Sequence, residues 1–560
     1  MVAPDPQLEA IIKRFGAQVG VGSTREEQLR SAVIANADRL QLLNAQASSG
    51  QLRDFKLETT GSTLIGSFDK ASGVVSLPDA SFTSADTVAS ADLRAVVGIQ
   101  AISAQFAHRT WQDAAGQYQA VSQNMLENLQ ATFDGSPVLA TQLKEAVLQT
   151  HVEHFGLLGN DMAAGATYDG STSDGTPRGI NLPPLALQTK TAANPGGKFD
   201  PADMTFVLGH EIQHGFNDAA KDAATHRFLQ EIAIQAGART TVHDYSDELR
   251  EYLAAGRNDE ARAQIAGWNA LLSRENQRDP YGDGLDLMFN TQNDRVLDFL
   301  QPDQRDPSKA VAKPGLTFNP DGSLSPTPAN ITAMGQHYFD RPSPLHAQPG
   351  ERPVTLGEGR PGPSADYTNY YGTWAVERII AAEDRASVRH RGARPQIAID
   401  MAGLGLREDL IEMEGLDLGT NRAPRPYLDT SRTPASLGHF HHTQDASMGH
   451  DHRHIPVVGP ARIGSSGDAV VDAWIDALQE GDNAAARSVQ RAFAQSHEGQ
   501  RLWAEATATA LRGQAHGRDP APLLQQALPR SDGRWPASAP SISDPHWLHD
   551  LPEPQHAMQR

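Results

Sequence analysis

Apolar residues along this chain recur mainly three and four residues apart, the spacing that places them on one face of an α-helix. This spacing characterises residues 1–60 and 92–158, whereas residues 60–84 read as short strands and turns. Representative helical stripes are Leu8, Ile11, Ile12 and Phe15, then Val97, Ile99, Ile102 and Phe106, and then Met125, Leu129 and Phe133. The first part of the chain is therefore predicted to be largely helical.

Two short strands are predicted next, at residues 166–170 and 178–182. The stretch between them is rich in Ser, Thr, Gly and Asp and ends in a proline, which is typical of a turn. Asp200 and Pro201 then suit the cap and the first turn of a helix. Its apolar side is supplied by Met204, Val207, Leu208, Ile212 and Phe216. The pattern as a whole predicts an α+β chain that is mostly helical and contains a small mixed sheet.

Changes in composition divide the chain into segments. The predicted segments are an N-terminal helical and short-strand region (1–90), a larger globular domain (91–432) with a Pro- and Gly-rich excursion (300–365), a His-rich linker (433–465), a small helical domain (466–515) and a disordered tail (516–560). The tail is predicted to be disordered because Pro and Ser are abundant and apolar periodicity is weak.

The helix predicted from Pro201 onward contains His210-Glu211-Ile212-Gln213-His214. Residues four apart lie on the same face of a helix, so these two imidazoles can bind one metal ion. The carboxylate of Glu211 is then placed to act on a water molecule at that metal. The apolar neighbours indicate that the motif is buried, and buried charged groups need partners or a metal. Zn²⁺ is the predicted cofactor.

A strand or hairpin that runs into an HExxH helix resembles the arrangement of the zincin metallopeptidases. The resemblance covers about residues 150–275 and depends on His210, Glu211 and His214. It implies a zincin-like catalytic domain in which an edge strand pairs with an extended peptide substrate. It also implies hydrolysis of peptide bonds, with Glu211 as the general base for a zinc-activated water.

A catalytic zinc usually has three protein ligands, and the sequence after His214 lacks the third histidine of the metzincins. A gluzincin-like arrangement implies a glutamate from a later helix. Glu260 is favoured because Ala263 and Gly267 share its helical face, and small residues let two helices approach closely. Glu231 is the alternative ligand, on a second helix that a short loop would return to the metal.

Zincins often use a later Tyr or His to stabilise the oxyanion. The aromatic stretch 366–374 offers Tyr367, Tyr370 and Tyr371, of which Tyr370 is the predicted catalytic residue, and His337-Tyr338 is a second candidate. The zinc-binding histidines also need hydrogen-bond partners that orient their rings. Candidates for that role are Asn217, Asp218 and Asp259.

Six histidines gather in a second region, residues 436–454. They are His439, His441, His442, His450, His452 and His454. The flanking residues are mainly Gly, Ser, Thr and Asp and show no apolar periodicity. We interpret the tract as a linker with incidental metal affinity. Zinc capture or a pH-sensitive hinge is the alternative.

Charge and composition exclude several classes of function. The 68 acidic residues outnumber the 48 Lys and Arg, for a formal net charge of −20, which argues against a nucleic-acid partner. The chain contains no Cys, so thiol catalysis and disulfides are excluded. No G-x-S-x-G elbow opens a helix. No apolar run approaches the ~18 residues of a membrane span, and no Sec-type signal peptide is recognised.

The layout of a metallopeptidase core, a His- and Gly-rich linker and a small helical tail resembles bacterial effector and polymorphic-toxin proteins. It implies a chain that is cytoplasmic before export and is secreted or translocated without a Sec-type leader. Expected partners are a peptide or protein substrate and a secretion-system component or cognate inhibitor. Two alternative functions are a toxin that cleaves peptidoglycan stem peptides as an amidase or endopeptidase, and a non-catalytic adaptor with a zincin scaffold.

Overall fold

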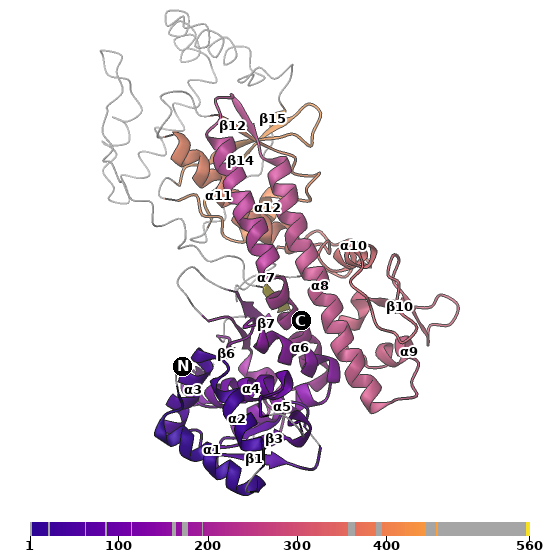
Figure 1. Ribbon diagram of the computed structural model, residues 1–560. Helices are drawn as coiled ribbons and strands as arrows, with labels where there is room; N and C mark the ends of the chain where they lie inside the picture. The colour runs from indigo at the N-terminus through magenta and orange to yellow at the C-terminus, as the bar shows by residue number, and fades with distance from the viewer. Residues whose placement is uncertain are drawn as a thin grey trace, which may run out of the picture.

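The computed structural model describes residues 3–443 and two short later segments, 455–456 and 556–559. Residues 21–22, 62, 84–86, 114, 160–163, 171–176, 193, 355, 357–364, 388–394 and 420–421 are not described. The chain is α+β, about half helical with small mixed sheets, which confirms the predicted class. Two long helices, α7 (Pro201–Ala236) and α8 (Ser246–Arg278), pack side by side through the middle of the molecule (Figure 1).

The N-terminal part of the chain packs helices against a small sheet with strand order β1-β3-β2. Its elements are α1 (Pro6–Val19), α2 (Arg25–Ile34), α3 (Ala37–Ser48), β1 (Asp54–Glu58), β2 (Ser67–Asp69), β3 (Val74–Pro78), the 3₁₀ helix η1 (Asp79–Ser81), α4 (Ala91–Ala107), β4 (Thr110–Gln112), β5 (Tyr118–Ala120), α5 (Gln123–Asp134) and α6 (Pro137–Leu148). Helix α4 is apolar around most of its circumference and is almost wholly buried, so it forms the centre of this part.

A four-stranded sheet precedes α7, with strand order β16-β7-β8-β6. Its strands are β6 (His154–Leu157), β7 (Ala164–Asp169), β8 (Gly179–Leu182) and β16 (His556–Gln559), and the 3₁₀ helix η2 (Pro184–Leu187) follows β8. Strands β7 and β8 are antiparallel and correspond to the two predicted strands, whereas β6 is parallel to β8. The predicted turn between β7 and β8 falls mostly outside the described residues.

Helix α7 begins where the sequence predicts. The side chain of Asp200 accepts hydrogen bonds from the backbone N–H groups of Ala202 and Asp203, and Pro201 occupies the first turn. The helix spans 36 residues in all and includes Glu231. The predicted loop between the HExxH helix and a second helix with Glu231 is therefore wrong. The physical reason is local: residues 218–225 are rich in Ala and contain no Gly or Pro, which favours an uninterrupted helix.

Helices α7 and α8 approach closely because both carry glycine at their crossing. A Cβ atom added to Gly209 would lie 2.8 Å from the Cβ of Ala270, and one added to Gly267 would lie 2.8 Å from the backbone oxygen of Phe206. Any larger side chain at these positions would push the helices apart. The small residues that favoured Glu260 as a ligand therefore have the expected effect on helix packing.

The Pro- and Gly-rich excursion is ordered over most of its length. The region from 284 onward holds α9 (Gly284–Phe289), the 3₁₀ helix η3 (Asp294–Asp298), β10 (Leu300–Pro302), β11 (Ala310–Ala312) and α10 (Pro328–His337). Its loops are fastened to α8, because the indole Nε1–H of Trp268 donates to the backbone oxygen of Gly322 at 3.0 Å. The side-chain amide of Asn269 donates to the backbone oxygen of Leu324 at 2.9 Å.

The C-terminal end of α7 lies against a second sheet, which has the strand order β15-β14-β13-β12-β9 (Figure 1). Its elements are β9 (Val242–Asp244), α11 (Tyr367–Ser387), β12 (Gln396–Ile399), α12 (Glu408–Met413), β13 (Arg425–Asp429), β14 (Ser436–Phe440) and β15 (Ile455–Pro456). Strands β9, β12 and β13 are parallel, and β14 and β15 continue the sheet in antiparallel fashion.

Two predicted segments differ from the structure. Residues 436–440 were expected in a linker but form β14, which pairs with β13 along its whole length. Residues 556–559 were expected in a disordered tail but form β16, which pairs with β7. Strands of four or five residues carry little periodic signal, and pairing with a neighbouring strand decides whether they form. The predicted helical domain at 466–515 lies outside the described residues.

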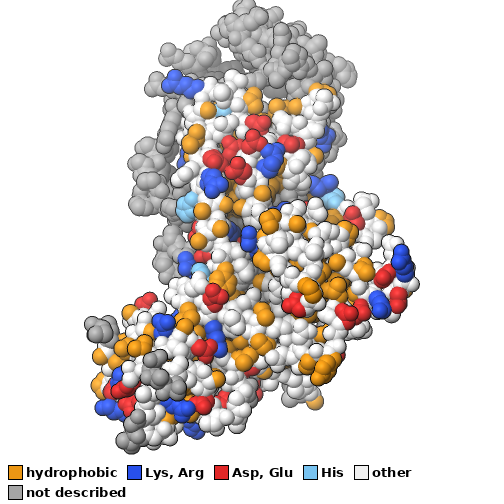
Figure 2. Space-filling model, turned by 45° about the vertical axis from the view of Figure 1, so that its right-hand side comes forward, with side chains coloured by type: hydrophobic (Ala, Val, Ile, Leu, Met, Phe, Trp, Pro, Cys, Tyr) orange, Lys and Arg blue, Asp and Glu red, His pale blue; other side chains and the backbone are white. Residues whose placement is uncertain are grey.

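Acidic and basic side chains are interspersed on the face of the molecule shown in Figure 2. This distribution gives that face no broad region of one charge.

Among the helices of the described residues, none combines the length and the apolar character needed to cross a bilayer.

Candidate metal centre

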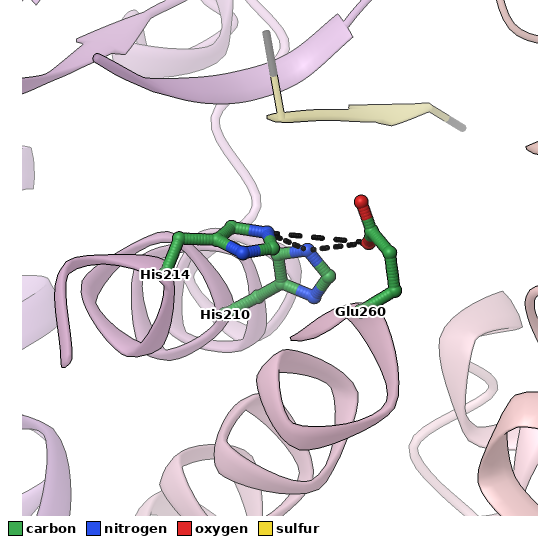
Figure 3. Close-up of side chains that lie close together, drawn as sticks. All are labelled: His210, His214 and Glu260. Atoms are coloured by element: carbon green, nitrogen blue, oxygen red, sulfur yellow. Dashed lines mark hydrogen bonds and ion pairs between the residues drawn. The ribbon is translucent and has the colours of Figure 1, made fainter. Parts of the chain in front are cut away.

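The two long helices bring His210, His214 and Glu260 together (Figure 3). The Nε2 atoms of His210 and His214 lie 2.9 Å apart. One carboxylate oxygen of Glu260 lies 3.5 Å from the Nε2 of His210 and 4.0 Å from that of His214. The three residues expose no more than 1 % of their surface. They form a buried group that could bind a metal ion.

The chemistry of this donor set fits Zn²⁺. Two imidazole nitrogens and one carboxylate oxygen are the ligands of many catalytic zinc sites. Two ligand atoms on a tetrahedral zinc, each about 2.0–2.1 Å from the metal, are roughly 3.3 Å apart. The observed separations of 2.9, 3.5 and 4.0 Å bracket this value. Only small side-chain movements are needed to place all three atoms around one ion.

The ring of His214 is oriented by Asp259, the residue before Glu260. The Nδ1 of His214 lies 3.1 Å from Oδ1 of Asp259. A carboxylate only accepts hydrogen bonds, so Nδ1 carries the hydrogen. The side-chain amide of Asn217 donates to the same oxygen at 2.8 Å and holds Asp259 in place. Of the three predicted orienting residues, Asp259 contacts the ring directly and Asn217 acts through Asp259. The third, Asp218, forms an ion pair with Arg178 at 3.2 Å instead.

Glu211 follows His210 in the chain, beside the group of possible ligands, and is wholly buried. Among the described residues, neither of its carboxylate oxygens has a hydrogen-bond partner. Burial raises the pKa of Glu211 to about 8, and the nearby charge of Glu260 adds to this effect, while the charge of His214 opposes it. A buried carboxyl group without a hydrogen-bond partner is costly, which makes Glu211 a candidate functional residue.

The other buried groups of the centre have shifted pKa values as well. Burial lowers the pKa of His214, but the hydrogen bond and charge of Asp259, together with the charges of Glu260 and Glu211, outweigh this effect and raise the pKa to about 9. Burial raises the pKa of Glu260 to about 7. A bound cation would lower these pKa values, because it stabilises carboxylates and displaces protons from imidazole nitrogen.

Two tyrosines, Tyr371 and Tyr338, lie next to the same group. The hydroxyl of Tyr371 donates to Oε1 of Glu260 at 3.1 Å. The ring of Tyr338 lies 6.2 Å from that of His210, and its hydroxyl is hydrogen-bonded to that of Tyr367. Burial raises the pKa of Tyr371 and Tyr338, so both hydroxyls stay protonated and able to donate. Tyr371 was one of the tyrosines of the aromatic stretch named from the sequence, but its contact with Glu260 was not predicted.

Tyr370 is the catalytic tyrosine that the sequence suggested. It is partly buried against the core, and its ring packs edge-on against that of Tyr371 at 5.8 Å. Its role as oxyanion donor stays a prediction. Glu231, the alternative third ligand, lies on α7 itself, 17 residues beyond His214. At about 1.5 Å per helical residue it is roughly 25 Å away along the helix axis, too far to share the ion.

Part of the His-rich tract contributes to a second group of possible ligands, in which the two glutamates are buried and the histidine is partly buried. Glu408 and Glu412 on α12 and His441, just after β14, bring one ligand atom each within 4.8 Å of one another. The backbone N–H of His441 donates to Glu412 at 2.6 Å, and the hydroxyl of Tyr427 donates to Glu408 at 2.8 Å. These bonds fasten the sheet to α12. Two carboxylates four residues apart on the helix were the sequence signal for this group, and His450, His452 and His454 lie outside the described residues.

Comparisons with protein-family models, with curated proteins and with solved structures found no match to this chain.

Proposed function

We propose that this chain is a zinc-dependent peptidase with a zincin-like catalytic domain. His210, His214 and Glu260 hold the metal in this proposal, and Glu211 is the general base. The observation that supports it most is the convergence of the three ligand atoms from two helices in a buried site, with the partnerless carboxylate of Glu211 beside them. That combination provides both the ligands and the base that metal-assisted hydrolysis requires.

Bound Zn²⁺ would acidify a water molecule and polarise the carbonyl of the peptide bond. With such a metal bound, Glu211 would be the residue that accepts a proton from water and returns it to the amine, since its carboxylate has no other hydrogen-bond partner in the described residues. Asp259 keeps the hydrogen of His214 on Nδ1, which would leave Nε2 free to bind the metal. Tyr371 fixes one oxygen of Glu260, which leaves the other to face the histidines.

The metal content of the purified full chain tests the first half of the proposal. We expect about one zinc ion per chain by elemental analysis, and loss of that zinc in His210→Ala. Glu231→Gln is a matched control because Glu231 lies on the same helix as His210 and His214, and it should leave the zinc content unchanged. Absence of stoichiometric zinc from the wild-type chain after expression with added zinc would disprove the assignment.

Hydrolysis of an unfolded protein such as casein tests the second half. Glu211→Gln should retain zinc and lose peptidase activity by at least a hundredfold, because the water loses its base. An adaptor with a zincin scaffold would keep its biological activity in the same variant. Export without a Sec-type leader, a cognate inhibitor and a peptidoglycan substrate stay predictions from the sequence.

A further inference from the structure

The metal centre is closed in this structure. His210, Glu211, His214 and Glu260 expose at most 1 % of their surface. A peptide bond must reach the metal and Glu211 if the proposed hydrolysis is to occur. Some segment that covers the centre must therefore move before a substrate can bind.

Strand β7 of the four-stranded sheet packs against α7, the helix that carries His210 and His214. Gly215, the residue after His214, faces Tyr168 of β7, and a Cβ added to Gly215 would lie 3.2 Å from the ring of Tyr168. The hydroxyl of Tyr168 is fixed by a 3.0 Å hydrogen bond to the backbone oxygen of His151. Strand β7 therefore packs against α7 one residue beyond His214.

Residues 556–559 form that further strand. Strand β16 pairs with β7 in antiparallel fashion, with His556 opposite Tyr168, Ala557 opposite Thr167 and Gln559 opposite Ala164. Strand β16 also lies against α7, and Figure 3 shows it passing the side chains of the metal-binding group. Without β16, β7 would be an edge strand, which is the kind of element that captures an extended peptide.

The pairing has the features of a segment that can be displaced. Only three residue pairs are formed, and the register shifts between Ala557 and Gln559. Such an irregularity interrupts the ladder of hydrogen bonds. An extended peptide with an unbroken register would make a more complete set of backbone hydrogen bonds with β7.

We infer that residues 556–559 occupy the edge of β7 at which an extended peptide substrate pairs, so that the chain keeps its own metal centre closed. This inference rests on the proposed peptidase function for the identity of the displaced ligand. A substrate peptide competes with β16 for the same backbone groups. Occupation by β16 therefore raises the apparent KM and leaves kcat unchanged.

The test uses the full chain with the double substitution Ala557→Pro and Met558→Pro. Successive N–H groups of a strand point to opposite sides, so one of the two prolines removes the N–H that faces β7. The matched control is Ser538→Pro with Ala539→Pro, which places two prolines in the chain outside β16. Hydrogen–deuterium exchange is followed in the peptide that covers residues 164–169.

We expect exchange to accelerate at least tenfold in the β16 variant at those β7 amides that point away from β8, and to stay unchanged in the control. A synthetic peptide of residues 553–560, added in excess, should restore protection, and the same peptide with proline at 557 should not. Equal exchange in the wild-type chain and the β16 variant would overturn the inference, whatever the peptidase assay shows.

Casein hydrolysis by the same chains separates the two ideas. If both are correct, the β16 variant hydrolyses casein several-fold faster than the wild type below saturation, and the rates converge at high substrate. If β7 loses protection but no zinc-loaded chain hydrolyses casein or peptides, the proposed function fails and the pairing of β16 with β7 stands. If the variant loses protection of β7 but hydrolyses casein no faster than an active wild type, β16 does not close the centre and the inference fails.

Discussion

The Nδ1 atom of His214 lies 3.1 Å from the carboxylate of Asp259, whereas the next residue, Glu260, places an oxygen 4.0 Å from Nε2 of the same ring. Two consecutive acidic residues of α8 therefore act on opposite nitrogens of one imidazole of α7. One orients the ring, and the other faces the position that a metal would occupy. This relationship makes the role of Asp259 testable apart from that of the ligands.

Asp259→Asn should weaken zinc binding about 10- to 100-fold without unfolding the chain, because the orienting carboxylate is lost while the ligands stay in place. Competition with a zinc-binding dye measures the change. Asp218→Asn is the matched control, since Asp218 pairs with Arg178 instead. Equal zinc affinity in Asp259→Asn and the wild type would show that Asp259 does not orient His214.

Removal of zinc should lower the stability of the chain. A ligand at 100 times its Kd stabilises the folded state by about 2.7 kcal/mol, because it binds the folded chain and not the unfolded one. Thermal unfolding with zinc and with excess chelator measures this difference. In His210→Ala the two melting temperatures should coincide. A similar shift in that variant would place the stabilising metal elsewhere.

Gly267→Ala should destabilise the chain by about 1–3 kcal/mol and reduce its zinc affinity. The added Cβ would lie 2.8 Å from the backbone of Phe206, so α7 and α8 must separate. Gly237→Ala is the control, because its added Cβ would lie 3.4 Å from the backbone oxygens of Ala233 and Ile234, an ordinary contact distance. Chemical denaturation and zinc titration would measure both effects, and wild-type behaviour of Gly267→Ala would contradict the close packing.

Tyr371→Phe and Tyr370→Phe separate two roles for the aromatic stretch. Tyr371→Phe removes the hydrogen bond to Glu260 and should weaken zinc binding by about 0.5–1.5 kcal/mol. If Tyr370 is the oxyanion donor, Tyr370→Phe should lower kcat about 10²- to 10³-fold and leave zinc binding unchanged. Steady-state kinetics on the zinc-loaded chains decide between these outcomes. Full activity of Tyr370→Phe would remove the residue from the mechanism.

Glu377 should make stability depend on pH. Burial raises the pKa of Glu377 to about 7, although the backbone N–H of Asp417 and the charge of Arg378 act in the opposite direction. Between about pH 4.5 and 7 the folded chain therefore keeps a proton that the unfolded chain releases, so the free energy of unfolding falls as pH rises through this window.

Glu377→Gln should remove this contribution and make the chain more stable than the wild type at pH 8, by about 1–2 kcal/mol, with little difference at pH 4.5. Thermal unfolding across this pH range measures the effect. Glu251→Gln, at an exposed position, is the control. Parallel pH profiles of the wild type and Glu377→Gln would refute the prediction.

The sequence by itself determined the local parts of the site. Asp200 and Pro201 define the start of α7, and the spacing of His210 and His214 puts both rings on one face, since helical geometry depends only on neighbours in the chain. The small residues Ala263 and Gly267 also indicated close packing before the partner helix was known. These features follow from local stereochemistry and periodicity.

Only the tertiary structure decided which distant groups meet the histidines. Sequence spacing left Glu260 and Glu231 open, and the continuous course of α7 removed Glu231 while the glycine-lined crossing with α8 brought Glu260 to the site. The tertiary structure also decided the contact of Tyr371 with Glu260 and the pairing of residues 556–559 with β7. Four residues are too few to show the periodicity of a strand. Contacts between residues far apart in the chain depend on how helices and strands pack, and local preferences carry little of that information.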